Sequence, residues 1–380
     1  MRRVKRPKTT MRNKAFAYGV CLFALTLCCC SQTPELKSFP YETTIDLFGS
    51  SDGPESIHFH AAAQREYLAG PVDEIHYYGQ GQSELSKPLK PTIHWEGSAS
   101  LYTVSISEKR DYTDSFVVEI TENQYSFSNL KIQTPYYYKV EDKTSVVKEG
   151  SFRIDDEIIR NMDIDGVTNV RDLGGYLING KRTNQGMIYR TGRLNQNHVN
   201  PAVDKITEQG KKEMLEALKV RSEIDLRTVS DNEVGGLNEG VGVLGPSVRY
   251  FQCPMVYNNA HFDASNDPSL RRTFEILGDK DNYPVFFHCS IGTDRTGYIA
   301  WLINAYLGLD EESLWRDYLF SNFGDIGGSR SKSSIENGYV RDIKNSAGTT
   351  LREKTRSYLL DRGVAQSHLD TLREMMGLPA

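Results

Sequence analysis

The residues best able to do chemistry lie in the stretch HCSIGTDRTG (288–297), where five residues separate Cys289 from Arg295. A loop that leaves a strand and enters a helix can turn successive backbone N–H groups inward, and the N-terminus of the helix strengthens such an anion site. Gly292 permits a backbone conformation that other residues resist. The planar fork of Arg295 can grip two phosphate oxygens. We therefore expect a phosphate-binding loop.

The same positive field predicts a reactive thiolate, because it depresses the pKa of Cys289. Attack of the thiolate on phosphorus would give a phosphocysteine intermediate, which water then hydrolyses. Thr296 can donate to the sulfur and help it leave, and His288 supports the loop. A structural cysteine in an inert loop is the alternative, but the predicted strand, loop and helix favour catalysis. The expected phosphate-binding residues are Ser290, Ile291, Gly292, Thr293, Asp294, Arg295 and Thr296.

The elements that position this loop alternate along residues 155–380. Strands are predicted at SEIDL (222–226), VRYFQCP (248–254) and PVFFH (284–288), and helices at EQGKKEMLEAL (208–218), TGYIAWLINAYL (296–307, ending at Gly308), TLREKTRSYLLDR (350–362) and SHLDTLREMMG (367–377). Strands that alternate with helices predict an α/β fold, a mostly parallel sheet flanked by helices. We expect this catalytic domain to occupy residues 155–380.

Residues 41–154 have a different pattern, rich in Val, Ile, Tyr, Phe and Thr. Strand-like runs occur at SLYTVSIS (100–107), DSFVVEIT (114–121) and TPYYYKVED (134–142), with Asp111, Asn123 and Asn129 as turn formers between them. Several short strands at this spacing predict a β-sandwich. Neither a catalytic set nor a metal cluster stands out in this segment, so a binding or spacer role is the default expectation.

One segment within this module is more specific. In NLKIQTPYYYKV, one alternating register contains Leu130, Ile132, Thr134, Tyr136, Tyr138 and Val140. This resembles the tyrosine-corner strand of fibronectin type III domains, a likeness that covers about residues 89–154. It implies Tyr136 as the corner residue and Trp95 as the core tryptophan. Another kind of β-sandwich is the alternative.

The N-terminus has the layout of an export signal. A basic stretch precedes an apolar run from Ala15 to Leu27, which is shorter than the roughly 20 residues of a spanning helix. The three cysteines after it resemble a bacterial lipoprotein signal, with Cys30 as the lipidated residue; a plain cleaved signal or an uncleaved anchor is the alternative. We expect a signal peptide at 1–30, a polar linker at 31–40, and an exported lipoprotein tethered to a membrane, periplasmic or at the cell surface.

Composition and the absence of certain sequence motifs argue against several other classes of protein. The net charge of −5, from 45 basic and 50 acidic residues, gives no footprint for nucleic-acid binding. The 38% hydrophobic content argues against several membrane spans. Cys253 is expected to be a buried small hydrophobe. No cysteine pair has zinc-site spacing, and no Walker loop or dinucleotide fingerprint occurs, so we expect neither a metal nor a cofactor.

HCSIGTDRTG is similar to the signature of cysteine-based protein-tyrosine and dual-specificity phosphatases. Further segments resemble the bacterial tyrosine-phosphatase family that also acts on phosphoinositides: TNVRDLGGY (168–176), GMIYRTGRL (186–194), EIDLRTVSDNE (223–233) and LWRDYLFSN (314–322). The likeness runs from about residue 160 to residue 377. It implies a phosphomonoester hydrolase.

The resemblance also implies roles for single residues. In that family the Asp directly before the Arg is the general acid, which is Asp294 here; the alternative is that Asp294 only orients Arg295 and that Asp225 or Asp231 supplies the proton. Further family positions that shape the pocket match Asp172, Asp225 and Arg227. Buried structural ion pairs are the alternative for these three residues.

One departure from the family bears on the substrate. Members often carry Lys before that Asp, and this chain has Thr293, which removes a positive charge that would favour polyanionic headgroups. A protein-tyrosine phosphatase, with a phosphotyrosine protein or peptide as partner, is therefore the leading expectation. The alternatives are a phosphatase of phosphoinositides or other small phosphomonoesters, and an inactive phosphate-binding or adhesion lipoprotein.

Overall fold

The computed structural model describes residues 34–49, 53–195, 205–228 and 242–380 of the chain. The expected signal peptide and Cys30 lie outside the described residues, as does Asp231. Among the described residues, no helix is both long enough and apolar enough to cross a bilayer. Residues 35–380 form one unit, which contains both the β-rich segment and the α/β segment.

The larger sheet contains the strands predicted around the phosphate loop. Its described strands follow the order β15-β14-β16-β13-β10-β9, with bounds β9 Arg160–Asn161, β10 Arg171–Asp172, β13 Ile188–Thr191, β14 Ser222–Asp225, β15 Arg249–Gln252 and β16 Val285–His288. β14 is parallel to both β15 and β16, and β13 is parallel to β16. β10 is antiparallel to β13 and β9. The sheet is thus parallel at its centre and antiparallel at one side, in keeping with the expected α/β fold.

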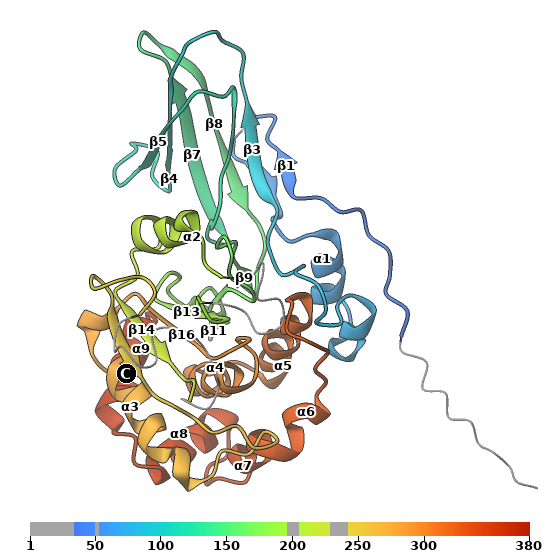
Figure 1. Cartoon of the computed structure of the whole chain (residues 1–380), viewed down its shortest axis with the longest axis vertical. Helices are drawn as coiled ribbons and strands as arrows, with labels where there is room; N and C mark the ends of the chain where they lie inside the picture. Colours follow the sequence, from blue (N-terminus) through green and yellow to red (C-terminus); the bar gives the residue numbers. More distant parts are fainter. Residues whose placement is uncertain (1–33, 50–52, 196–204, 229–241) are drawn as a thin grey trace, which may run out of the picture. The chain divides into compact units, whose positions relative to one another are not determined.

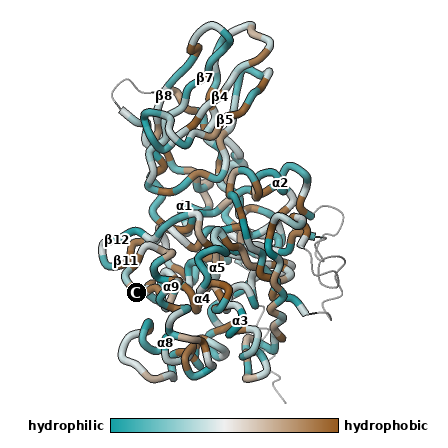
Figure 2. The backbone as a smooth tube through the Cα atoms, turned by 90° about the vertical axis from the view of Figure 1, so that its left-hand side faces the viewer, coloured by the Kyte–Doolittle hydropathy of each residue, from teal (hydrophilic) through white to brown (hydrophobic). Residues whose placement is uncertain are grey.

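Side chains of β16 alternate between two hydrophobic layers, as the two-residue period of a strand requires. Val285 and Phe287 join the cluster that contains most of helix α4 (Asp294–Leu307). Phe286 joins the opposite cluster with Met214, which lies in the π-helical turn η2 (Glu213–Ala217) that continues α2 (Glu208–Lys212). Figure 2 shows brown, hydrophobic stretches at α4. The sheet therefore lies between two helical layers (Figure 1).

The remaining described helices of the α/β segment are α3 Asp267–Leu277, α5 Glu311–Phe320, α6 Ser333–Ile335, η7 Glu336–Val340, α7 Arg341–Lys344, α8 Leu351–Asp361 and α9 Gln366–Met375, with short 3₁₀ turns η4 Ala264–Asn266, η5 Lys280–Asn282 and η6 Ser321–Phe323. Among them, α8 and α9 lie close to their predicted places, and the others were not predicted. α4 ends at Gly308, whose φ of 112° suits glycine. A capping box between Thr350 and Glu353 begins α8.

The β-rich segment forms two sheets. One has the order β2-β8-β7-β4-β5 and the other β1-β3-β6, with bounds β1 Thr44–Asp46, β2 Glu55–Ile57, β3 Lys90–His94, β4 Tyr102–Ser107, β5 Phe116–Ile120, β6 Gln124–Ser126, β7 Thr134–Glu141 and β8 Val146–Ile154. Side chains of both sheets share one buried cluster, which includes Trp95 and Tyr138. The backbone N–H of Lys131 donates to the Tyr136 hydroxyl at 2.7 Å, the kind of contact a tyrosine corner makes. Membership of the fibronectin type III class stays a prediction.

The expectation of an entirely β segment at 41–154 is wrong for residues 62–77. Helix α1 (Ala62–Ala69) and the 3₁₀ helix η1 (Val72–Tyr77) lie there, and Tyr67 belongs to the hydrophobic cluster of the α/β segment. Arg316 of α5 donates to the carbonyls of Tyr67 and Gly70 at 3.0 and 2.8 Å. Both helices pack on an apolar surface of the α/β segment, and α1 also has a cation at its carbonyl end. The predicted domain boundaries themselves stay predictions.

A short antiparallel pair, β11 (Leu177–Ile178) and β12 (Lys181–Arg182), completes the described strands.

Candidate active site

The predicted phosphate loop joins β16 to α4. Cys289 follows the last residue of β16, Asp294 is the first residue of α4, and Arg295 is the second. Gly292 has a φ of 69°, and a Cβ at that position would lie 2.5 Å from the carbonyl oxygen of Thr191. Glycine is therefore required at position 292 both by its backbone conformation and by the space available.

The carbonyl side of the loop is held from behind. The Asn169 amide donates to the carbonyls of Ile291 and Gly292 at 3.2 and 3.1 Å, and to the hydroxyl of Thr293 at 3.1 Å. Arg190 also donates to the Gly292 carbonyl at 2.7 Å. Because C=O and N–H point in opposite directions across a trans peptide, the N–H groups of Gly292 and Thr293 face away from Asn169 and Arg190. With the first amides of α4, they form an anion-binding nest.

Two buried arginines share one carboxylate behind this loop. Asp317 of α5 accepts from Arg171 Nε at 3.0 Å and from Arg190 Nη1 at 2.6 Å. Burial alone would raise the pKa of Asp317, but the two guanidinium groups lower it below its ordinary value. Arg171 in turn donates to the side-chain oxygen of Asn169. Asp317 therefore fixes the two residues, Asn169 and Arg190, that orient the loop.

Sequence reasoning did not name these four residues, although a signal was present. Three of the segments that resembled the phosphatase family, 168–176, 186–194 and 314–322, contain Asn169, Arg171, Arg190 and Asp317. A motif shows that such residues belong together, but only the fold shows that they act on the loop.

Cys289 lies at the bottom of this arrangement, with 1% of its surface exposed. Burial would raise the pKa of the thiol, but Arg295 and the hydroxyl and amide of Thr296 outweigh it and lower the pKa below its ordinary value. Arg295 also donates to the hydroxyl of Ser290 at 3.2 Å across the loop. The structure thus brings together the predicted nucleophile and the predicted phosphate clamp, and favours the thiolate that attack on phosphorus requires.

His288 supports Cys289 through the main chain. Its Nδ1 lies 3.1 Å from the carbonyl oxygen of Cys289, and its Nε2 lies 3.0 Å from Glu223 Oε1. Burial lowers the pKa of His288, but Asp225 and Glu223 raise it to a value above the ordinary one. The ring is fully buried, so its role is to hold the start of the loop and not to contact substrate.

The three supporting residues implied by the resemblance form buried ion pairs. Asp225 binds Arg227 at 2.6 Å and accepts from the Tyr250 hydroxyl at 2.7 Å. Burial opposes ionisation, but His288 and Arg227 bring the pKa of Asp225 to about 2. Asp172 binds Arg160 at 2.6 Å and accepts from the Gly174 N–H at 2.7 Å. Asp172 and Asp225 are thus in buried ion pairs, and a contact of either with substrate stays a prediction.

Glu223, Asp225 and His288 offer ligand atoms within 4.8 Å of one another. However, Arg227 occupies both oxygens of Asp225, with Nε at 2.9 Å from Oδ1 and Nη2 at 2.6 Å from Oδ2. A carboxylate already neutralised in this way is a poor ligand for a cation, so the donor set does not fit a metal ion.

Among the described candidates for the general acid, Asp294 lies close enough for its negative charge to raise the pKa of the Cys289 thiol. The Asp294 side chain is 16% exposed, whereas Asp225 is fully buried in its pair with Arg227. Both oxygens of Asp294 accept hydrogen bonds from Arg330, from Nε and Nη2, each at 3.0 Å. Arg330 was not predicted from the sequence; it lies in a Gly- and Ser-rich stretch without periodicity.

Tyr257 lies beside the same groups. Burial raises the pKa of Tyr257 to about 12, and the charges that act on it include Asp294, Arg330 and Cys289. Its side chain is 37% exposed, and its ring meets that of Phe262 edge-on at 5.9 Å. An exposed aromatic ring thus lies near the predicted nucleophile.

The chain belongs to the tyrosine phosphatase family, because residues 162–377, more than half of its length, match that family. A Cupriavidus necator protein, named as a candidate tyrosine-protein phosphatase, is 25% identical over 187 residues, which are 43% of this chain and 63% of that protein. The chain thus spans less than two thirds of the length of this relative.

Two solved structures are also similar. The core catalytic domain of the PP-IP phosphatase SIW14 from S. cerevisiae, in complex with citrate, has a TM-score of 0.30 at 19% identity, covering 47% of this chain and 93% of that one. PTPMT1 in complex with PI(5)P has a TM-score of 0.26 at 10% identity, covering 47% and 96%. Scores this low say nothing about the substrate of this chain.

Proposed function

We propose that the protein is a phosphomonoester hydrolase that acts on phosphotyrosine in proteins or peptides. One observation carries the proposal: a buried cysteine with a lowered pKa lies in a loop whose carbonyls are held from behind and whose amides face the other side. A thiolate next to an anion nest and a guanidinium is equipped to attack a bound phosphate. Membership of the tyrosine phosphatase family supports the same class of reaction.

The reaction takes two steps. In the first, the Cys289 sulfur attacks phosphorus, the bond from phosphorus to the tyrosine oxygen breaks, and that oxygen takes a proton from Asp294. In the second, water attacks phosphorus, the bond from phosphorus to sulfur breaks, and Asp294 takes the proton from the water. Arg295 and the loop amides bind the phosphoryl oxygens throughout, where negative charge is concentrated. Inorganic phosphate is released, and the Cys289 thiolate is regenerated.

The depth of the nucleophile supports phosphotyrosine over phosphoserine. Cys289 is 1% exposed, so a phosphate must be carried on a long side chain to reach it. The exposed ring of Tyr257, which lies near Cys289, can pack against a phenyl group. Thr293 adds no positive charge, and its hydroxyl binds Asn169 behind the loop. Nothing at this position favours a polyanionic headgroup.

A substrate panel tests the proposal. The protein is assayed with a phosphotyrosine peptide, the matching phosphoserine peptide and a phosphoinositide. We expect turnover of the phosphotyrosine peptide to dominate by at least about 100-fold, within the range that differential transition-state binding supplies. Dominant turnover of the lipid would replace the proposed substrate, and no turnover of any ester would contradict the class.

Two variants test the mechanism in the same assay. Cys289→Ser should abolish hydrolysis while phosphate binding persists, because the clamp stays intact. Arg295→Lys should lose most of the activity, because Lys cannot make the two parallel hydrogen bonds. Unchanged turnover in Cys289→Ser would remove this residue from the mechanism.

For location, we propose an exported protein tethered to a bacterial membrane by a lipid on Cys30. The basic stretch, the apolar run and the three cysteines support this proposal. Mass spectrometry of the mature N-terminus tests it: a diacylglycerol-modified Cys30 is the expected product. The fibronectin-type module is proposed as a binding or spacer element.

A further inference from the structure

The inference concerns Arg330, which lies outside the motifs identified in the sequence. It rests on the proposed function. We propose that Arg330 is a positioning residue that orients the Asp294 carboxyl group for proton transfer. The guanidinium holds both carboxylate oxygens at 3.0 Å in a bidentate pair. Such a pair fixes the plane of the carboxyl group, which a single hydrogen bond does not.

Arg330 is itself held rigidly. The buried side chain of Asn322 accepts from the Arg330 N–H at 2.7 Å and donates to its carbonyl at 3.0 Å. Arg330 Nη1 also donates to the Gly328 carbonyl at 3.1 Å. The side chains of Arg330 and Asp294 are 22% and 16% exposed, so the pair is largely shielded from water. A fixed backbone and a fixed side chain leave Asp294 little freedom.

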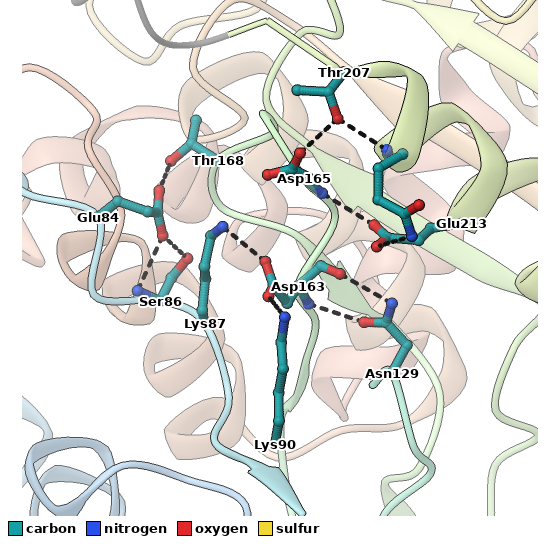
Figure 3. Close-up of polar contacts among 12 residues, drawn as sticks. Glu84, Ser86, Lys87, Lys90, Asn129, Asp163, Asp165, Thr168, Thr207 and Glu213 are labelled. Atoms are coloured by element: carbon teal, nitrogen blue, oxygen red, sulfur yellow. Dashed lines mark hydrogen bonds and ion pairs between the residues drawn. The ribbon is translucent and has the colours of Figure 1, made fainter. Parts of the chain in front are cut away.

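The loop that carries Arg330 is braced by a segment far away in the sequence. Gly81 accepts at its carbonyl from the N–H groups of Ile326 and Gly328, at 3.2 and 2.8 Å, and its own N–H donates to the Asn322 carbonyl at 2.8 Å. Glu84, shown in Figure 3, accepts from Thr168 and, at 3.4 Å, from the N–H of Asp325. The segment that contains Gly81 and Glu84 and the loop that carries Arg330 therefore form one rigid support.

This support fits the needs of proton transfer. A general acid must meet the leaving oxygen within hydrogen-bond reach, and small errors in position cost large factors in rate. Asp294 precedes Arg295 and cannot be moved without moving the phosphate clamp. Its carboxyl group still has rotatable bonds, and Arg330 restricts these.

A double-mutant cycle tests the inference, with Arg330→Gln and Asp294→Asn alone and together. The phenolate that leaves phenyl phosphate is a poor leaving group and depends on a proton from the general acid. The 4-nitrophenolate that leaves 4-nitrophenyl phosphate is a better leaving group and depends on it less. We expect Arg330→Gln to lower kcat for phenyl phosphate by about 10-fold or more, part of the 10²–10⁴-fold that general acid catalysis supplies. The loss with 4-nitrophenyl phosphate should be smaller, and KM should change little. In the Asp294→Asn background, Arg330→Gln should cost less than about 2-fold.

Arg330→Lys serves as the conservative variant and should recover only part of the rate, because it restores charge without the bidentate geometry. Arg341→Gln is the matched control, since the Arg341 side chain is 52% exposed and pairs with Asp342. Equal losses in both Asp294 backgrounds would overturn the inference and assign Arg330 to direct substrate contact.

If the wild type hydrolyses no aryl phosphate, the proposed function fails. Thermal unfolding of the wild type, the two single variants and the double variant still measures the coupling between Arg330 and Asp294. A non-additive shift in Tm would support the clamp on Asp294, and additive shifts would overturn it.

Discussion

Asp317 offers the sharpest test of how the phosphate loop is held. Its single carboxylate is shared by Arg171 and Arg190, whose side chains are fully buried. Asp317→Asn keeps the shape of the side chain and removes the charge. Two guanidinium groups are then left in the interior without a counter-charge, and Arg190 loses the partner that aims it at the Gly292 carbonyl.

The expected loss of stability is large. Removing one partner of a buried ion pair costs about 3–5 kcal/mol. At about 2.1 cal/mol/K per residue, the unit of residues 35–380 unfolds with an entropy of about 0.7 kcal/mol/K, so Asp317→Asn should lower Tm by about 4–7 °C. Turnover should fall as well, because the amides of the loop lose their fixed direction.

The assay is thermal unfolding by calorimetry, alongside kinetics on a phosphotyrosine peptide. Glu312→Gln on the same helix is the control, because Glu312 pairs with Arg316 but its side chain is 65% exposed. A surface pair of this kind contributes about 0–1 kcal/mol. If Asp317→Asn unfolds within about 2 °C of the control and keeps its turnover, the buried network does not support the loop.

Three further predictions concern the loop, acid stability and the N-terminal segment. Gly292→Ala should abolish turnover in kinetic assays, because its Cβ meets the Thr191 carbonyl at 2.5 Å; Gly180→Ala, where a Cβ meets nothing within 4 Å, should keep it. The pKa of Asp225 is about 2 in the folded protein and about 3.9 in the unfolded chain. Its carboxylate therefore contributes roughly 2–3 kcal/mol to the free energy of unfolding, a contribution that is complete above pH about 4 and is lost as the pH falls through about 2. In acid-unfolding measurements, the free energy of unfolding of Asp225→Asn should depend less on pH in this range. A fragment of residues 157–380 should fail to unfold cooperatively in calorimetry, because it lacks Tyr67 and its neighbours; a cooperative fragment would contradict this.

The sequence was sufficient for the parts of the site that lie next to one another in the chain. Cys289, Asp294 and Arg295 fall within seven residues, and the strand and helix around them have clear periods. The structure places these three residues together at the junction of β16 and α4. Local pattern predicts such a junction well because the loop geometry and the chemistry share the same few residues.

The residues that support the loop could not be predicted from local sequence pattern. Asn169 acts on a carbonyl at Gly292, 123 positions away, and Arg330 acts on Asp294 from 36 positions away. Helix α1 was missed for a related reason, since its face is completed by contacts with the α/β segment, such as that between Tyr67 and Phe323 at 5.9 Å. Tertiary packing, which a single sequence does not display, selects these conformations.

The pattern of support has a consequence for the mechanism. The loop is held through its carbonyls by Asn169 and Arg190, through Asp294 by Arg330, and through the Cys289 carbonyl by His288. Each of these side chains is anchored on a different element, so no single movement releases the loop. An anion site built in this way is ready before substrate arrives, and its amides need no reorganisation as charge develops on the phosphoryl group. We therefore expect selectivity to come from the depth of Cys289 and from groups beside the loop, such as Tyr257, and not from closure of the loop itself.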